Sequence, residues 1–183
     1  NIVNPLFSLV MGFGVMLGAG GSAVIAKNIG EGEEQQAFDN LSTLVFFGTI
    51  LGLVLMVLLL VFMEPILSLL GATEILMPYC KEYCYYIVGF LAPWVLELMF
   101  SSYFITAGKP QIGLIATLCS GVFNIVGDYV LIVVVGMGIR GAALATGLAT
   151  CIPVVIALIY FFNKEHSLHF GRIMNRPRMI LKS

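Results

Sequence analysis

The chain has 183 residues, of which 60% are hydrophobic and only 10% are charged, and its formal net charge is −1. Its mean hydropathy is +1.02, whereas about 25% of the residues of an ordinary soluble domain are charged. So few charges cannot cover the surface of a soluble protein, which makes lipid the solvent for at least part of this surface. We expect no nucleic-acid partner.

Five apolar runs follow one another along the chain. A membrane helix needs roughly 20 apolar residues to cross about 30 Å of hydrocarbon. The runs cover about residues 3–26, 41–63, 85–107, 111–135 and 142–162. Their connections are short, so neighbouring helices are antiparallel. The sequence predicts an all-α, polytopic membrane helix bundle, with five transmembrane helices over residues 1–162.

The start of the chain is unusual, because Asn1 stands only a few residues before an apolar run and no methionine precedes it. No charged n-region or small-residue cleavage site precedes the run, so a signal peptide is not indicated. We expect this sequence to be a segment of a longer protein. An odd number of spans also places its two ends on opposite sides of the membrane.

Lysine and arginine favour the cytoplasmic side of a membrane, and their distribution between the loops is uneven. One set of loops holds Lys27, Lys109, Lys164, Arg172, Arg176, Arg178 and Lys182, and the other holds Lys81 and Arg140. This split predicts that Asn1 lies outside and that residues 163–183 form a cytoplasmic basic connector. The acidic stretch "EGEEQQAFD" is then also cytoplasmic, which the rule allows because Asp and Glu contribute little to it.

The stretch "GMGIRG", residues 136–141, matches the G-x-G-x-x-G pattern of dinucleotide sites. That pattern also needs an acid about 20 residues later, where this chain has Phe161 in an apolar run. We therefore predict a tight glycine turn between two membrane helices.

The histidines and cysteines indicate no metal centre. His166 and His169 are three residues apart, but no third ligand is evident, so we assign them to a solvated basic segment at the membrane surface. Cys80 and Cys84 are four residues apart, which predicts an ordinary helical pair in preference to a disulfide or metal site.

A polar stripe crosses the fourth apolar run. Its members are Thr117, Ser120, Asn124 and Asp128, whose spacing places them on one helix face. Packing between membrane helices accounts for serine and threonine. It does not account for Asp128, because a carboxylate at bilayer depth costs a few kcal/mol and by default indicates a functional site that faces a cavity.

Counting residues from the turn places Thr146 beside this stripe. Asp128 lies roughly 12 Å below the outer end of its helix, and Thr146 lies roughly 7–8 Å along the helix that returns, with Thr150 one turn deeper. Hard cations prefer oxygen ligands, so Asp128, Asn124 and Thr146 form a candidate Na⁺ site. A desolvated carboxylate can carry a proton instead, because burial disfavours its charged form. The sequence leaves both possibilities open.

A second acid, Glu97, lies in the third run, roughly 15 Å from the cytoplasmic end and near the midplane. Pro93 and Ser101 share its helix face, and Pro93 is expected to free a backbone carbonyl and bend the helix. No intramembrane Lys or Arg is present. Because an acidic cavity favours cationic cargo, we take Glu97 and Ser120 as candidate substrate-cavity residues. The alternative is that Glu97 pairs with a group in another part of a longer protein.

No Ser–His–Asp, metal-ligand or phosphate-loop arrangement appears in the sequence, so we expect no enzyme activity and no cofactor apart from a coupling H⁺ or Na⁺.

Three stretches resemble the multidrug and toxic compound extrusion (MATE) transporters. They are "GAGGSAVIAKNIGEGEEQQA", "SSYFITAGKPQIGLI" and "FNIVGDYVLIVVVGMGIRGAALAT". The resemblance covers about residues 1–165 and implies helices two to six of a six-helix amino-terminal lobe. It also implies a proton or sodium site at the matching positions Asn124, Asp128 and Thr146. The family's site uses a further acid on the first helix, which this chain lacks, and Glu97 matches no family position.

The sequence therefore predicts part of a secondary active multidrug efflux transporter of the plasma (inner) membrane. We expect it to export small organic cations by proton or sodium antiport, through alternating access between two related halves. Its partners would be the bilayer and the missing first helix and second lobe of the same protein. The alternatives are a lipid-linked precursor flippase of the same superfamily and a non-transporting membrane assembly subunit. A flippase of anionic lipids would be expected to show cationic cavity residues, and an assembly subunit would tolerate loss of Asp128.

Overall fold

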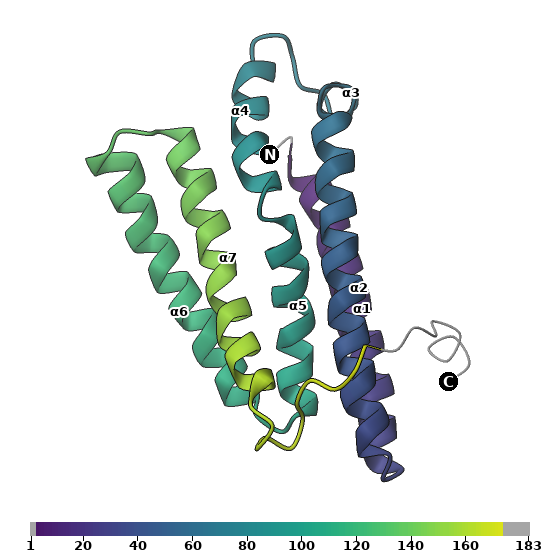
Figure 1. Ribbon diagram of the computed structural model, residues 1–183. Coiled ribbons are helices and arrows are strands. Elements are labelled where there is room, and N and C mark those ends of the chain that lie inside the picture. The colour runs from purple at the N-terminus through teal and green to yellow at the C-terminus, as the bar shows by residue number, and fades with distance from the viewer. Residues whose placement is uncertain (1–2, 174–183) are drawn as a thin grey trace.

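Helices are the regular structure of residues 3–173, the part of the chain that the computed structural model describes (Figure 1). In chain order the elements are α1 (Asn4–Gly30), α2 (Glu34–Val61), α3 (Met63–Leu69), α4 (Met77–Val88), α5 (Leu91–Thr106), α6 (Pro110–Asp128), the π-helix η1 (Tyr129–Val134) and α7 (Ile139–Phe162).

Four helical stretches are long and apolar enough to cross a membrane: α1, α2, α6 with η1, and α7. The pair α4 and α5 passes the same test together and makes a fifth candidate span. This confirms the predicted all-α chain with several membrane spans; the sequence predicts five spans, and the described part of the structure has four, or five if the bent pair α4 and α5 is one span. The runs predicted at 3–26, 41–63, 111–135 and 142–162 each overlap one of the four long stretches.

The third predicted run, 85–107, is not one straight helix. α4 ends at Val88, α5 begins at Leu91, and the two helices are bent by 56°. Pro93 explains the break, because it has no N–H to donate to the Gly89 carbonyl and its ring clashes with helical backbone there. The bend expected from Pro93 is therefore present, one turn before it, and α4 continues outward to Met77.

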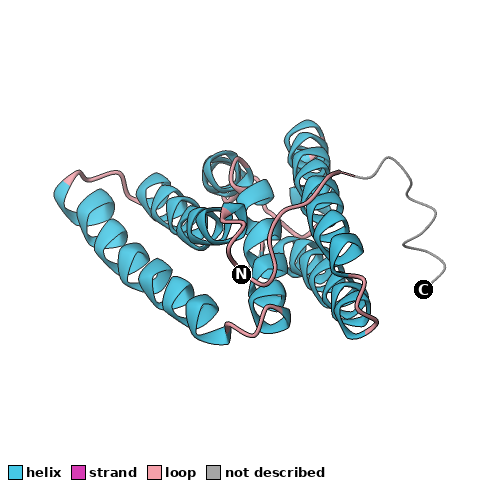
Figure 2. Cartoon of the chain, turned by 60° about the horizontal axis from the view of Figure 1, so that its bottom comes forward, coloured by secondary structure: helices cyan, strands magenta, loops and turns pink. Residues whose placement is uncertain are grey.

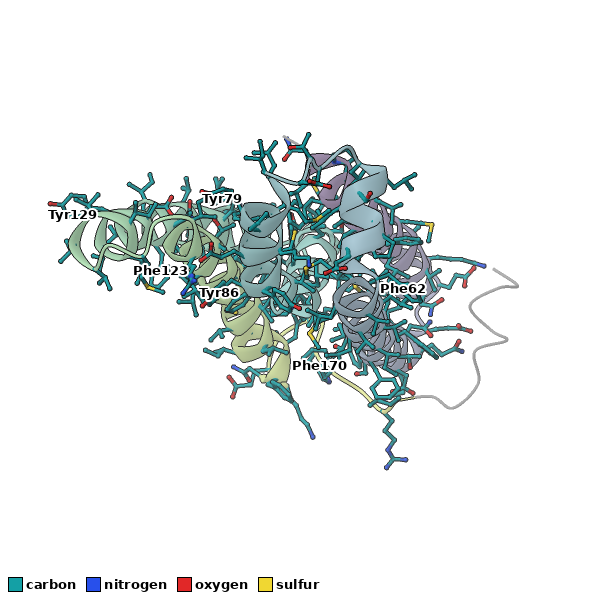
Figure 3. The ribbon with its side chains drawn as sticks, turned by 90° about the horizontal axis from the view of Figure 1, so that it is seen from above. Phe62, Tyr79, Tyr86, Phe123, Tyr129 and Phe170 are labelled. Carbon is teal, nitrogen blue, oxygen red and sulfur yellow. The ribbon has the colours of Figure 1, made fainter. Side chains whose placement is uncertain are left out.

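α5 is the central helix of the bundle (Figure 1). It packs against α1 and α2 on one side and against α7 on the other, and it buries Met99, Phe100 and Tyr103. α6 is the most exposed helix, and Phe123 and Tyr129 project from its arm of the bundle (Figure 3). Exposed apolar side chains of this kind suit a helix whose solvent is lipid.

Glycines bring α1 and α2 close to α5. A Cβ on Gly18 of α1 would stand 3.1 Å from the Leu98 carbonyl oxygen, and a Cβ on Gly52 of α2 would stand 2.5 Å from the Ala92 Cα. Small residues let membrane helices approach this closely, so that backbone packs on backbone and dispersion holds the helices together.

Two ion pairs join the elements at the end of the bundle that holds α3. Lys81 of α4 pairs with Glu64 of α3, and Arg140 of α7 pairs with Glu82 of α4. Exposed pairs contribute only about 0–1 kcal/mol each to stability. Their main consequence is that Lys81 and Arg140, the two cations of the loops predicted to face outside, each have an acidic partner.

The stretch "GMGIRG" is the predicted glycine turn. Gly136 and Gly138 have φ of 75° and 56°, which are left-handed values that favour glycine, and α7 begins at the next residue. The turn reverses the chain between η1 and α7 (Figure 1).

Residues 163–173 run across the opposite end of the bundle, from α7 to α2 (Figure 2). Gly171 N–H donates to the Phe38 carbonyl at 3.2 Å, and Arg172 N–H donates to Asp39 Oδ1 at 2.7 Å. The predicted connector residues Arg176, Arg178 and Lys182 lie outside the described residues.

The two histidines of this segment are half-buried and pack on aromatic rings, whereas Asn163, Lys164, Glu165 and Ser167 are exposed, so the prediction of a solvated segment is wrong only for the histidines. His166 stacks on Tyr160 with ring centroids 4.1 Å apart, and His169 lies 4.0 Å from the ring of Phe38. Leu168 between them is fully buried. Sequence spacing gives no signal for these contacts of the histidines, because Tyr160 and Phe38 lie on other elements.

We expect Gly52→Ala to lower the melting temperature of the full-length protein in detergent. The new Cβ would meet the Ala92 backbone at 2.5 Å, and overpacking of this kind costs about 1–3 kcal/mol. Gly20→Ala is the matched control, because no atom of the described residues lies within 4 Å of its Cβ position. Equal melting temperatures for the two variants would contradict the close packing of α2 on α5.

Candidate ion-coupling site between α6 and α7

The site is built on the interface between the antiparallel helices α6 and α7 (Figure 1). Small residues bring these helices together. A Cβ on Gly127 would stand 3.1 Å from the Cβ of Ala145, and a Cβ on Gly141 would stand 2.9 Å from the Leu131 backbone carbon. The short side chains of this interface can therefore reach the facing helix.

Two hydrogen bonds cross the interface. Asn124 Nδ2 of α6 donates to Thr146 Oγ1 of α7 at 3.3 Å. One turn earlier in α6, Ser120 Oγ donates to the Ala149 carbonyl of α7 at 2.7 Å. Asn124 and Thr146 thus meet, as the residue count predicted.

Asp128 is the last residue of α6, one turn beyond Asn124 on the same helix. Its side-chain oxygen Oδ1 is buried and has no hydrogen-bond partner within residues 3–173. Among residues 3–173, one other buried side-chain polar atom lacks a hydrogen-bond partner: Tyr160 Oη, near the far end of α7. A buried carboxylate oxygen without a partner is costly, so a bound proton or cation at Asp128 would be stabilising.

Tyr83 of α4 interacts electrostatically with Asp128. Tyr83 is not among the residues predicted for the site, because nothing in its spacing along the sequence links it to the polar stripe. Its ring packs edge-on against Phe7 with centroids 6.3 Å apart, and Phe7 also contacts Trp94 at 5.2 Å. These aromatic contacts join α4 to α1 and α5 beside the α6–α7 interface.

The backbone changes from α- to π-helix at the residue after Asp128. In η1 the Val135 N–H donates to the Val130 carbonyl at 2.9 Å, which is the wider i→i−5 bond. Such π turns are rare and are frequent at functional sites. The β-branched run in this stretch gave no specific signal for it.

The remaining threonines of the predicted cluster bond within their own helices. Thr117 is exposed and donates to the Gly113 carbonyl at 3.0 Å, so its hydroxyl bonds within α6 and not across the interface. Thr150 is buried and donates to the Gly147 carbonyl at 2.7 Å. Neither hydroxyl proton is thus available at Asp128.

Glu97 lies apart from Asp128. It borders a narrow crevice of about 10 Å³ between α5, α6 and α7, which Ser101, Thr117 and Pro153 also line. Glu97 makes no hydrogen bond or ion pair with another described residue, although it interacts electrostatically with Cys151. Thr117 precedes Asp128 by eleven residues, or roughly 16 Å of helix, so the two acids occupy separate levels of the bundle.

The chemistry of the interface suits a hard cation or a proton. Asp128 offers carboxylate oxygens, Thr146 a hydroxyl oxygen, and Asn124 keeps its amide oxygen because its Nδ2 faces Thr146. Oxygen donors of these types suit Na⁺. No group of three His, Cys, Asp or Glu side chains that could hold a metal occurs among residues 3–173.

Comparison with known proteins shows the family to which the chain belongs. The sequence model of the MatE family matches residues 1–130. "Multidrug export protein MepA" of Staphylococcus haemolyticus (strain JCSC1435) is 32% identical over 169 residues, which are 91% of this chain and 37% of that protein. The protein of the same name from Staphylococcus aureus (strain MRSA252) is 29% identical over 163 residues, which are 88% of this chain and 36% of that protein.

Solved structures share the fold. The "Crystal structure of MATE in the bent conformation" gives a TM-score of 0.92 at 23% identity and covers 99% of this chain and 41% of that chain. The inward-facing structure of a multidrug resistance MATE family transporter of the MOP superfamily gives 0.91 at 22% identity, covering 99% and 42%. The chain thus spans less than half the length of the proteins it matches. With a family model that matches most of its residues, this chain belongs to the MATE family of multidrug export transporters, as its sequence motifs predicted, and is not an enzyme.

Proposed function

We propose that this chain is part of a secondary active transporter that exports small organic cations by antiport with protons or sodium ions. It supplies five helices of a six-helix lobe, and the first helix and a second lobe of the same protein complete the transporter. The protein lies in the plasma (inner) membrane with Asn1 outside. Residues 163–183 form the cytoplasmic connector to the second lobe.

The observation that carries this proposal is the unpartnered, buried Oδ1 of Asp128 at the end of α6. Every other polar side chain of the predicted stripe donates a hydrogen bond, but this carboxylate oxygen accepts none from a described residue. Keeping such an oxygen ionised in a low-dielectric surrounding is costly. A site that alternately binds and releases a cation accounts for the retention of this carboxylate.

Ion binding at Asp128 can drive a conformational cycle only if the ion binds two conformations with different affinity. Asp128 stands where α6 changes to η1, and Thr146 stands on the facing helix α7. An ion held between Asp128, Asn124 and Thr146 would favour the conformation in which α6 and α7 are closest. Release of the ion would favour the other conformation.

Glu97 is the group that we propose to face cationic cargo. It is half-buried in a crevice without a basic partner among the described residues. A carboxylate in that position attracts cations and repels anions.

We expect Asp128→Asn to abolish gradient-driven efflux while the protein still folds and inserts. Asparagine keeps the shape and hydrogen-bonding capacity of aspartate but cannot ionise, so the coupling ion loses its charge partner. Asn124→Ala and Thr146→Ala should raise the ion concentration for half-maximal transport by about 3- to 10-fold, as loss of one hydrogen-bonding group suggests.

The measurement is efflux of a fluorescent cation from vesicles that hold the full-length protein, under proton and sodium gradients imposed separately and normalised to inserted protein. Glu31→Gln, an exposed acid in the α1–α2 turn, is the control and should transport at the parental rate. Parental efflux by Asp128→Asn against the substrate gradient would reduce Asp128 to a packing residue and refute the proposal.

We expect Glu97→Gln to weaken export of a lipophilic cation more than it lowers expression, and the parent to leave a matched lipophilic anion untransported. The control is Glu74→Gln, which removes an exposed acid from the α3–α4 loop. The same vesicle assay, with cation and anion compared at equal concentration, gives the result. Unchanged cation export by Glu97→Gln would remove Glu97 from the mechanism.

We expect position 109 to face the cytoplasm and position 140 the exterior, because of the uneven distribution of Lys and Arg. Both side chains are exposed in the structure, so single cysteines there should react with a maleimide. In intact cells, on a background free of native cysteines, an impermeant maleimide should label position 140 alone. Labelling of position 109 alone would reverse the orientation.

A further inference from the structure

Pro153 lies inside α7 and leaves one backbone carbonyl without its usual partner. In a regular helix the N–H of residue 153 would donate to the Ala149 carbonyl, but proline has no N–H. Ala149 is 4% exposed, so water does not reach this carbonyl freely. A buried carbonyl without a partner is destabilising, and lipid offers no substitute.

Ser120 of α6 supplies the missing donor. Its hydroxyl donates to the Ala149 carbonyl at 2.7 Å, and Ser120 itself is 8% exposed. The usual partner for a serine hydroxyl on a membrane helix is a carbonyl of its own helix, as in Ser8, which donates to Asn4 at 3.0 Å. The hydroxyl of Ser120 instead joins two helices, and the proline on the second helix is the reason that an acceptor is free.

This bond lies one helical turn from the candidate coupling residues on both sides of the interface. Ser120 precedes Asn124 by four residues, and Ala149 follows Thr146 by three. The bonds Ser120–Ala149 and Asn124–Thr146 are therefore successive links between the same two helices. Beyond them, Gly127 packs against Ala145 beside Asp128.

We propose that Ser120 is a positioning residue for ion coupling, which together with Pro153 holds α6 and α7 in the register that places Asn124 opposite Thr146, one turn from Asp128. This inference rests on the proposed function of those three residues. It assigns Ser120 a different task from the substrate cavity suggested by the sequence, an expectation that stays a prediction. The Ser120 hydroxyl donates its proton to the Ala149 carbonyl. Loss of this hydroxyl would let the two helices slide or separate beside Asp128.

The test uses the dependence of Ser120 on Pro153. In a Pro153→Ala variant the new N–H can donate to Ala149, so the carbonyl no longer needs Ser120. We therefore expect Ser120→Ala to raise the ion concentration for half-maximal efflux by about 3- to 10-fold in the parent, as loss of a hydrogen bond suggests, and to change it little in the Pro153→Ala background. Ser120→Thr should keep the parental value, and Ser8→Ala is the control for loss of a serine hydroxyl.

A second measurement is independent of transport. Spin labels at Ile125 of α6 and Leu148 of α7, which are both exposed, report the distance between the helices beside the site. On a background free of native cysteines, Ser120→Ala should broaden the distance distribution, and Ser120→Ala with Pro153→Ala should restore it. If the parent shows no ion-dependent efflux but Ser120→Ala still broadens the distance distribution, the proposed function is refuted, whereas the role of Ser120 in holding the helix register stands.

Three outcomes would overturn the inference. The first is an unchanged distance distribution in Ser120→Ala, and the second is an equal effect of Ser120→Ala with and without Pro153. The third applies if the parent is ion-coupled: Ser120→Ala broadens the distance distribution but keeps the parental ion dependence of efflux. The last outcome would make Ser120 a packing residue only.

Discussion

The bilayer core contains no water, so every polar group at that depth must find its partner inside the protein. The α6–α7 interface follows this constraint closely. Ser120 donates to the carbonyl that Pro153 leaves free, and Asn124 donates to Thr146. Against this background the buried Oδ1 of Asp128, which no described residue contacts by a hydrogen bond, is conspicuous for energetic reasons. The lack of water thus accounts for the paired groups of the interface, and it makes the Asp128 carboxylate the group that a bound ion would stabilise.

Close helix packing makes those hydrogen bonds possible. Packed helices usually lie 8–10 Å apart, depending on the side chains between them, and a serine or threonine hydroxyl reaches only a short way. Gly127, Ala145 and Gly141 leave the facing helices little separation, and a Cβ on Gly141 would collide with the Leu131 backbone. Small residues at this interface therefore do more than favour association: they set a spacing at which short polar side chains can bond across it.

Much of this could be predicted from the sequence, because the signals are local. Apolar run lengths predict the long helices, spacing along α6 aligns Ser120, Asn124 and Asp128, and counting from the glycine turn brings Thr146 level with Asn124. The π-helix, the electrostatic interaction of Tyr83 with Asp128 and the acceptor of Ser120 could not be predicted this way. Each depends on how separate helices approach one another, and helical periodicity carries no information on that.

Backbone irregularities surround the site on three helices, and they have a common physical consequence. Pro93 accompanies the break between α4 and α5, η1 follows Asp128 directly, and Pro153 interrupts the bonding of α7. At each point at least one regular α-helical bond is missing or lengthened, so bending there breaks fewer bonds than bending elsewhere. The residues between these points are tied by interhelical bonds. If Asp128 is the coupling carboxylate, a change in its charge acts on a short, stiff interface that is flanked by more easily bent turns. The free energy of ion binding can then change the angles between helices instead of causing small distortions along their whole length.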